Sequence, residues 1–144
     1  MNTSHSEPPS EVDRLATLIL DAAMAVHRAL GPGYLENIYE EAMAIELELL
    51  GVPFERQHAF SVSYRDHEIG LSRLDFWVDG QVVVELKAVE ALIPVHHAQV
   101  LSYLRMTRTN LGLLINFNVP LLKNGIRRIV QSNQPWRRGV VAVQ

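Results

Sequence analysis

Three ionisable side chains interrupt an otherwise apolar stretch between residues 73 and 88. Asp75 precedes an Asp79-Gly80 turn signal, and Glu85 and Lys87 follow it, so the stretch has the pattern of a β-hairpin. Since residues i and i+2 of a strand share a face, Glu85 and Lys87 are expected to point the same way. The apolar residues that alternate with them are expected to face the core: Val82, Val84 and Leu86.

Whether Asp75 joins that face depends on the length of the hairpin loop. A three-residue loop, Asp79-Gly80-Gln81, pairs Val78 with Val82 and therefore Asp75 with Glu85, and it gives its glycine the positive-φ position. A two-residue Asp-Gly turn without a compensating bulge puts Asp75 on the opposite face. We predict the three-residue loop, because the alternative directs an acid toward the core side of the sheet.

Two carboxylates and an ammonium on one face suit metal-assisted attack on a phosphate. Asp75 and Glu85 are hard oxygen ligands of the kind that Mg²⁺ and Mn²⁺ prefer. Lys87 would orient the attacking water and stabilise the charge that builds on phosphorus. Without an ion the two carboxylates repel each other, so the site is expected to bind a cation or a proton readily. The alternative is a surface pair of opposite charges with no chemical role.

The composition fits one folded domain. The chain has 144 residues, of which 48% are hydrophobic, which is enough for a packed core. It contains no cysteine, which excludes disulfides, thiolate catalysis and cysteine zinc sites and is consistent with a cytoplasmic location. The first ten residues have no apolar run, so no signal peptide is expected. No stretch approaches the roughly 20 apolar residues that cross a bilayer, so no membrane contact is expected.

Charge is divided unevenly along the chain. Residues 1–90 hold all 16 acids, whereas residues 91–144 hold none. Such a split favours either a polyanionic partner or pairing of the two halves with each other or with a second subunit. Seven bases lie in the second part: Arg105, Arg108, Lys123, Arg127, Arg128, Arg137 and Arg138.

Two helices are expected before the hairpin. The first runs to Leu30 behind a Ser10 N-cap, and Gly31-Pro32-Gly33 ends it. Its buried stripe is predicted to be Val12, Leu15, Ile19, Ala22, Ala23 and Val26. The second helix runs from about Tyr34 to Leu50. Its buried stripe is predicted to be Leu35, Ile38, Tyr39, Ala42, Ile45 and Leu49, and its exposed acids Glu40, Glu41, Glu46 and Glu48.

Strands and a third helix complete the domain. A strand over 54–64 with a turn near 65–67 precedes the hairpin, and a helix over 95–107 follows it. Two further strands are expected over 110–117, which reads as buried on both faces, and over 126–130. The order ααβββαββ indicates an α/β domain around a central mixed β-sheet flanked by helices. It spans residues 10–130, between a disordered N-terminal tail (1–9) and a C-terminal extension (131–144).

Three short motifs along this order resemble those of one nuclease superfamily. Asp75, followed by Glu85-Leu86-Lys87, resembles the PD-(D/E)xK motif, although Leu74 stands where the motif has proline. Gln99 and Tyr103 are similar to the Gln-xxx-Tyr motif of its exonuclease branch. Gly33, Glu36 and Tyr39 match the signature of the GxxExxY family. The resemblance covers about residues 12–130, and the combined order of the motifs makes it specific.

The resemblance implies a restriction-endonuclease-like core and a metal-dependent phosphodiesterase site. It implies metal ligation by Asp75, Glu85, the backbone carbonyl of Leu86 and Glu36, with Mg²⁺ or Mn²⁺ as cofactor. Lys87 would be the catalytic lysine, and Gln99 would lie near the scissile phosphate. Glu36 could instead only favour the helix dipole, and Gln99 could bridge local backbone. Residues given secondary roles are Tyr39 and Tyr103, expected to pack with a bonded hydroxyl, and His97, expected near the phosphate.

The basic half of the chain then has a candidate partner. Nucleic acid, with DNA favoured, is the expected substrate, and the candidate backbone contacts are Arg105, Arg108, Lys123, Arg127 and Arg128. The overall prediction is a metal-dependent nuclease. The alternative is a non-catalytic nucleic-acid- or protein-binding module on the same fold. A homodimer, with the Val-rich end near residues 140–143 packed on a partner, is a third reading. The sequence leaves open the substrate form, the cut position and the number of metal ions.

Overall fold

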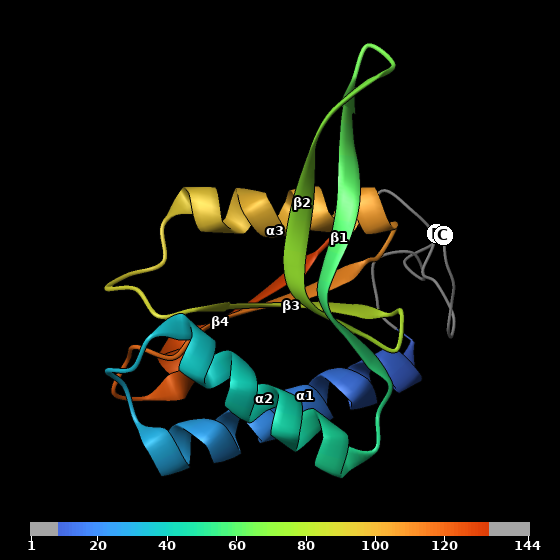
Figure 1. Ribbon diagram of the computed structural model, residues 1–144. Coiled ribbons are helices and arrows are strands. Elements are labelled where there is room, and N and C mark those ends of the chain that lie inside the picture. Colours follow the sequence, from blue (N-terminus) through green and yellow to red (C-terminus); the bar gives the residue numbers. More distant parts are fainter. Residues whose placement is uncertain (1–8, 133–144) are drawn as a thin grey trace.

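The computed structural model describes residues 9–132. The stretch 73–88 lies inside a mixed β-sheet (Figure 1). Its five strands run in the spatial order β1-β2-β3-β4-β5, and only β3 and β4 are parallel neighbours. Their bounds are β1 Phe54–Tyr64, β2 His67–Val78, β3 Val82–Lys87, β4 Leu111–Asn116 and β5 Ile126–Val130. The predicted boundaries of β1 and β5 are confirmed.

Helices cover both faces of this sheet. α1 (Ser10–Leu30) and α2 (Glu36–Leu50) lie on one face, and α3 (Pro94–Thr107) lies on the other, where it connects β3 to the parallel β4 (Figure 1). A short 3₁₀ helix, η2 (Leu122–Gly125), precedes β5. The predicted order ααβββαββ and the α/β class are therefore confirmed. The predicted tail and C-terminal extension lie almost entirely outside the described residues. None of the helices within 9–132 has the length and apolar character needed to span a bilayer.

α1 buries the stripe that its periodicity predicts, but its N-cap differs. All six predicted stripe residues are buried, together with Ala16. The helix begins at Ser10 itself, and Pro9 is the N-cap, with its carbonyl accepting from the backbone N–H groups of Val12 and Asp13 at 3.0 and 3.1 Å. The prediction of Ser10 as the N-cap was wrong, because the proline already supplies the extended residue and the carbonyl that start the helix.

α2 buries a different stripe from the one predicted. Tyr39, Met43 and Leu47 are buried at i, i+4 and i+8, whereas Leu35 and Leu49 are about three-quarters exposed. Ile38 and Ile45 are exposed as well. The helix carries two apolar stripes, and periodicity alone cannot say which one packs on the core. Of the predicted stripe, Tyr39 is buried, and Ala42 is partly buried and packs against the core cluster.

Two hydrophobic clusters separated by the sheet form the core. On the α1 and α2 side, one cluster includes Val82, Val84 and Leu86 of β3, as predicted. On the α3 side, a smaller cluster includes Val83, together with Val100 and Leu104 of the helix. Every residue of β4 is buried, which confirms the prediction of a strand covered on both faces.

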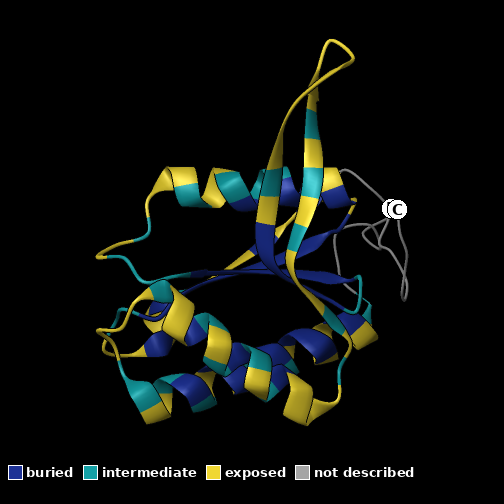
Figure 2. Ribbon diagram, in the orientation of Figure 1, coloured by how far each residue is buried: buried dark blue, intermediate teal, exposed yellow. Residues whose placement is uncertain are grey.

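The β1–β2 hairpin extends far beyond the rest of the sheet (Figure 1). Its distal part is mostly exposed, whereas the end of β2 near β3 is buried (Figure 2). Tyr64 pairs with His67 across a two-residue turn, in which Arg65 and Asp66 both have positive φ. β2 therefore changes from an exposed arm to a buried core strand along its length, and this change occurs near Asp75, whereas β1 has no buried residue.

Candidate active site

The loop between β2 and β3 has the predicted three residues. Val78 pairs with Val82, and the backbone N–H of Gln81 donates to the Val78 carbonyl at 2.9 Å. Asp79 and Gly80 both adopt positive φ, of 53° and 65°, where we had expected only the glycine to do so. The odd loop length is confirmed, and with it the register that directs Asp75 toward Glu85.

Asp75 and Glu85 meet through side chains at the point where β2 leaves β3. The strand ladder runs from Val78–Val82 to Phe76–Val84 and extends no further. Beyond it, Asp75 Oδ2 accepts from the backbone N–H of Leu86 at 2.8 Å, and Glu85 Oε1 accepts from the backbone N–H of Asp75 at 3.3 Å. Hydrogen bonds between carboxylate and backbone thus replace the backbone-to-backbone bonds that a continued ladder would make here. Both residues are buried: Asp75 is 7% exposed and Glu85 is 4% exposed.

Lys87 stands between the acids and α3. Its Nζ lies 3.5 Å from Glu85 Oε2 and donates to Gln99 Oε1 at 2.8 Å. Since Glu85 and Lys87 are two residues apart on β3, they share the sheet face that α3 covers. Gln99 reaches this face from the middle of α3, so the structure brings the strand-borne and helix-borne candidates together. The lysine side chain is only 13% exposed.

Burial makes the carboxylates of this site hold protons tightly. Burial, followed by the charge of Asp75, raises the pKa of Glu85 to about 8, although Lys87 acts in the opposite direction. Burial also raises the pKa of Asp75, with the charge of Glu40 contributing, while the hydrogen bond from Leu86 acts against this. The single lysine does not neutralise both acids, so the site favours a proton or an additional cation.

The charges of the site also change the pKa values of Glu36 and Tyr103. Glu36 is the first residue of α2, and its pKa is raised by partial burial and then by the charge of Asp75, with Lys87 lowering it. Burial and the charge of Glu85 raise the pKa of Tyr103 to about 12. Tyr103 is 4% exposed and packs edge-to-face on Phe60, as expected of a packing residue. Glu36 is therefore close enough to Asp75 and Lys87 for their charges to change its pKa.

The other candidates are Tyr39, His97 and the backbone of Leu86. Tyr39 is fully buried, and its hydroxyl donates to the Gly31 carbonyl at 2.6 Å and accepts from the Tyr34 N–H at 3.2 Å, which matches the predicted packing role. His97 is exposed in the first turn of α3. The side chain of Leu86 is buried in the core, so only its backbone faces the acids.

Two residues next to Asp75 were not identified from the sequence. Gln57 of β1 donates from Nε2 to Asp75 Oδ1 at 3.1 Å and to Glu40 Oε1 at 2.9 Å. Glu40, predicted to be an ordinary exposed acid, has a side chain only 13% exposed, and it also accepts from Arg56 Nε at 2.9 Å. The prediction for Glu40 was wrong. Its spacing of four from Glu36, which places both acids on one helix face, was the available signal.

The candidate nucleic-acid contacts do not form one patch. Arg105 and Arg108 lie at the end of α3, next to the beginning of β4, whereas Lys123 follows the opposite end of that strand. Arg127 donates to the carbonyls of Asn124 and Ile126. Arg128 forms an ion pair with Asp13 of α1 at 2.8 Å. That pair is the kind of contact between the acidic and basic halves that the sequence left open as the alternative.

The donor set at β3 fits a divalent cation, although the protein supplies few ligands. Within the described part of the chain, no group of three or more His, Cys, Asp or Glu side chains is arranged to hold a metal ion. Asp75 and Glu85 nevertheless present two buried carboxylates whose charge a divalent ion would offset, and magnesium sites commonly use one or two carboxylates with water. The residues present therefore fit Mg²⁺ or Mn²⁺.

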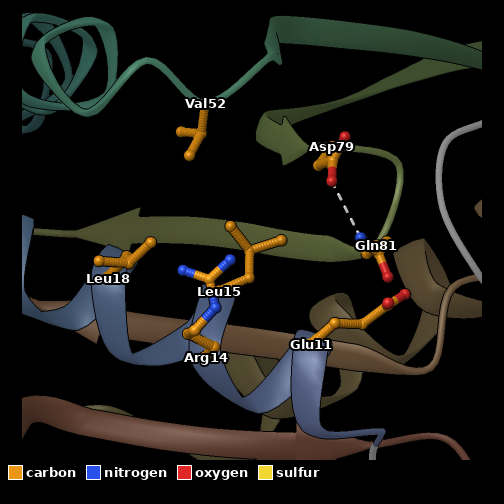
Figure 3. Close-up of a pocket in the computed structure, with 7 residues that line it drawn as sticks. All are labelled: Glu11, Arg14, Leu15, Leu18, Val52, Asp79 and Gln81. Atoms are coloured by element: carbon orange, nitrogen blue, oxygen red, sulfur yellow. Dashed lines mark hydrogen bonds between the residues drawn. The ribbon is translucent and has the colours of Figure 1, made fainter.

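A separate cavity of about 310 Å³ lies between α1 and the β2–β3 loop (Figure 3). Glu11 and Arg14 of the helix line it, with Asp79 and Gln81 of the loop. Gln81 Nε2 donates to Asp79 Oδ2 at 2.9 Å, while its buried Oε1 has no hydrogen-bond partner. None of the acids of the β3 site lines this cavity, so it is not part of the candidate active site.

Comparison with known proteins supports the motif-based reading. The family model of the PD-(D/E)XK nuclease superfamily matches residues 13–129, which is most of the chain. No curated protein and no solved structure matches the chain.

Proposed function

Because the chain belongs to the PD-(D/E)XK nuclease superfamily, we propose that it is a metal-dependent nuclease that hydrolyses phosphodiester bonds, with DNA as its substrate. One observation carries this proposal. Asp75, Glu85 and Lys87 lie together in a mostly buried part of the sheet, at positions where a strand with only a core role would carry apolar residues. The restriction-endonuclease-like fold supplies this arrangement by separating β2 from β3 at Asp75.

Asp75 and Glu85 would hold Mg²⁺ or Mn²⁺, with the Leu86 carbonyl as a further ligand and Glu36 at the ion or its water shell. When bound, the ion supplies a Lewis acid for the phosphoryl oxygen and lowers the pKa of coordinated water. The protein has already fixed one oxygen of Asp75 with the Leu86 N–H, so this carboxylate is oriented before any ion arrives. Such preorganisation limits the reorganisation needed during the reaction.

Lys87 and Gln99 would act on the phosphate and the attacking water. The carboxylate of Glu85 and the amide oxygen of Gln99 hold the ammonium of Lys87 from two sides. Ammonium has three N–H donors, so one remains to contact water or a phosphate oxygen. Gln99 accepts from Lys87 with its oxygen and also has a side-chain hydrogen bond with Tyr103, so of the two donors of its NH₂ group one would act on the scissile phosphate. The general contacts to the nucleic-acid backbone are proposed for Arg105, Arg108, Lys123, Arg127 and Arg128, acting on more than one side of the domain.

Cleavage assays test this function. The full chain is incubated with linear, nicked, branched and single-stranded DNA and with RNA, in Mg²⁺, in Mn²⁺ or in chelator. We expect metal-dependent cleavage of DNA that Lys87→Ala and Asp75→Asn each reduce by about 100-fold or more. Glu48→Gln, an exposed acid on α2, is the matched control and should retain activity. Undiminished activity in both site variants would show that another site, or a contaminant, performs the cleavage.

The non-catalytic binding module remains the second candidate, and metal binding separates the two. A divalent ion at 100 times its dissociation constant should stabilise the folded nuclease by about 2.7 kcal/mol. DNA affinity without any metal-dependent rise in melting temperature would favour the binding module.

A further inference from the structure

Gln57 has an unusual backbone for its place in the fold. It lies within β1, the edge strand, and adopts φ 53°. A non-glycine residue in this left-handed region costs about 1–2 kcal/mol, and such residues are normally found in turns. Arg56 pairs with Phe76 and His58 pairs with Leu74, so the register is the same on both sides. Gln57 therefore lies directly opposite Asp75, yet this is the pair that the ladder omits.

Opposite Gln57, the side chains of β2 change from one face of the sheet to the other. Leu74 belongs to the cluster on the α3 side, whereas Phe76 belongs to the cluster on the α1 and α2 side. Residues two apart on a regular strand share a face, so β2 must rotate between these two positions. Asp75 is the residue between them. The left-handed residue of β1 and the rotation of β2 are thus aligned across the hairpin, at the proposed metal ligand.

The side-chain contacts of Gln57 connect this kink to the site. The amide NH₂ group has two N–H donors, and its two acceptors are Asp75 Oδ1 and Glu40 Oε1, at 3.1 and 2.9 Å. Glu40 is in turn held by Arg56 at 2.9 Å. Asp75 Oδ2 already accepts from the Leu86 N–H. Each oxygen of the Asp75 carboxylate therefore has one fixed donor, which sets the plane of the carboxylate and leaves further lone pairs for a ligand.

We propose that Gln57 is a positioning residue, which orients the Asp75 carboxylate for the divalent ion and which Glu40 holds in place. The proposal rests on the proposed function, because it concerns the same metal site. The left-handed backbone of Gln57 is explained by this role, since a kink needed only to bend the hairpin would be served without strain by glycine. A partner that orients a metal ligand without touching the ion commonly affects metal affinity or activity 10–100-fold.

The test replaces the side chain while keeping the backbone shape. Gln57→Gly permits the left-handed conformation and removes the amide, so its melting temperature should equal or exceed that of the wild type. Mn²⁺ affinity, measured by calorimetric titration of the full chain, should fall about 10- to 100-fold. The kcat for DNA cleavage should fall with it while KM for DNA stays the same. Ser61→Ala is the matched control, because Ser61 also bonds a β2 side chain, Glu68, but on the exposed arm.

The outcomes are distinguishable. If Gln57→Gly keeps wild-type Mn²⁺ affinity and kcat, the positioning role is wrong while the nuclease assignment stands. If the wild type itself binds no Mn²⁺ and cleaves no DNA, the proposed function fails. If Gln57→Gly does not fold, Gln57→Met, which keeps the side-chain length without the donor, gives the same decision. A loss of affinity in Ser61→Ala equal to that in Gln57→Gly would also contradict the proposal, because the effect would then not be specific to Asp75.

Discussion

Val84 and Glu85 are neighbours on β3, and both are almost fully buried, yet they face opposite sides of the sheet. On the α1 and α2 side, Val82, Val84 and Leu86 belong to one buried hydrophobic cluster. On the α3 side, the strand carries Val83 and then two ionisable groups, Glu85 and Lys87. One short strand therefore has one face that stabilises the fold and one face that we assign to chemistry.

The difference shows that burial does not distinguish the two roles. Burying an ionisable carboxylate is unfavourable unless it is protonated, paired or bound to a cation. The raised pKa of Glu85, caused first by burial, is the sign that its environment opposes the charged form. Substitutions on the two faces should therefore differ in their effect on activity per folded molecule.

The largest effect is expected from Lys87→Ala on the α3 side. Loss of a preorganised donor to developing charge commonly lowers kcat by about 10²–10³. The free energy of unfolding should fall as well, because Lys87 is mostly buried and contacts Glu85 and Gln99, but the loss of activity should persist in fully folded protein. Initial rates of DNA cleavage in Mg²⁺, together with urea unfolding, measure both quantities. Wild-type activity per folded molecule in Lys87→Ala would contradict the separation of the two faces.

The next effect is a pH dependence of stability set by Glu85. Its pKa of about 8 in the folded protein lies above its ordinary value of 4.5, so the folded state holds the proton more tightly. The free energy of unfolding should be greatest below about pH 4.5 and fall as the pH rises to about 8, by on the order of 3 kcal/mol at pH 7.

Urea unfolding of the metal-free protein across this pH range measures the slope. Glu85→Gln should remove most of it, while Asp75 and Glu36 leave a smaller dependence of the same sign. Saturating Mg²⁺ should offset the loss at high pH. If the wild type and Glu85→Gln have the same slope, the carboxylate is not the group responsible.

On the opposite face, Val84→Ala should reduce stability and spare chemistry. Removing two buried methyl groups costs about 2 kcal/mol from lost transfer and the remaining cavity. The rate of cleavage per folded molecule should stay close to the wild-type value. Chemical unfolding and cleavage at a temperature well below the melting point provide the comparison with Lys87→Ala.

The smallest effect is expected from the exposed apolar stripe of α2, in comparison with its buried stripe. Ile45→Ala removes an exposed apolar side chain and should change the free energy of unfolding by less than about 0.5 kcal/mol. Met43→Ala, two residues away in the buried stripe, should cost about 2–5 kcal/mol. Thermal unfolding of the two variants decides between the stripe that the structure shows and the one predicted from periodicity. A large loss in Ile45→Ala would indicate that this surface is covered in solution.

Local patterns predicted the centre of the molecule better than its periphery. The hairpin register followed from parity and from the cost of pointing Asp75 into the core, and the buried run of β4 followed from its continuous apolar sequence. α2 could not be oriented this way, because Leu35, Ile38, Ile45 and Leu49 repeat as regularly as Tyr39, Met43 and Leu47. The choice between the two stripes depends on how the helix docks against α1 and the sheet, which is a tertiary property.

Gln57 and Glu40 show a second limit. A left-handed residue inside a strand has no sequence signal when the residue is glutamine. Its contact with Asp75 depends on β2 leaving β3 at that level, which no local pattern specifies. Glu40 could be predicted to share a face with Glu36, but its contact with β1 requires the packing of α2 beside the hairpin. The motif residues could thus be identified from the sequence, whereas their neighbours Gln57 and Glu40 could not.

The most direct measurement is a crystal structure of the protein grown with Mn²⁺, with the ion located by its anomalous scattering. We predict a Mn²⁺ peak on the α3 side of β3, within coordination distance of carboxylate oxygens from both Asp75 and Glu85. The same experiment on Asp75→Asn should show a weakened or absent peak. A wild-type structure with no ion between these two acids at saturating Mn²⁺ would contradict the assignment of this face to metal-dependent catalysis.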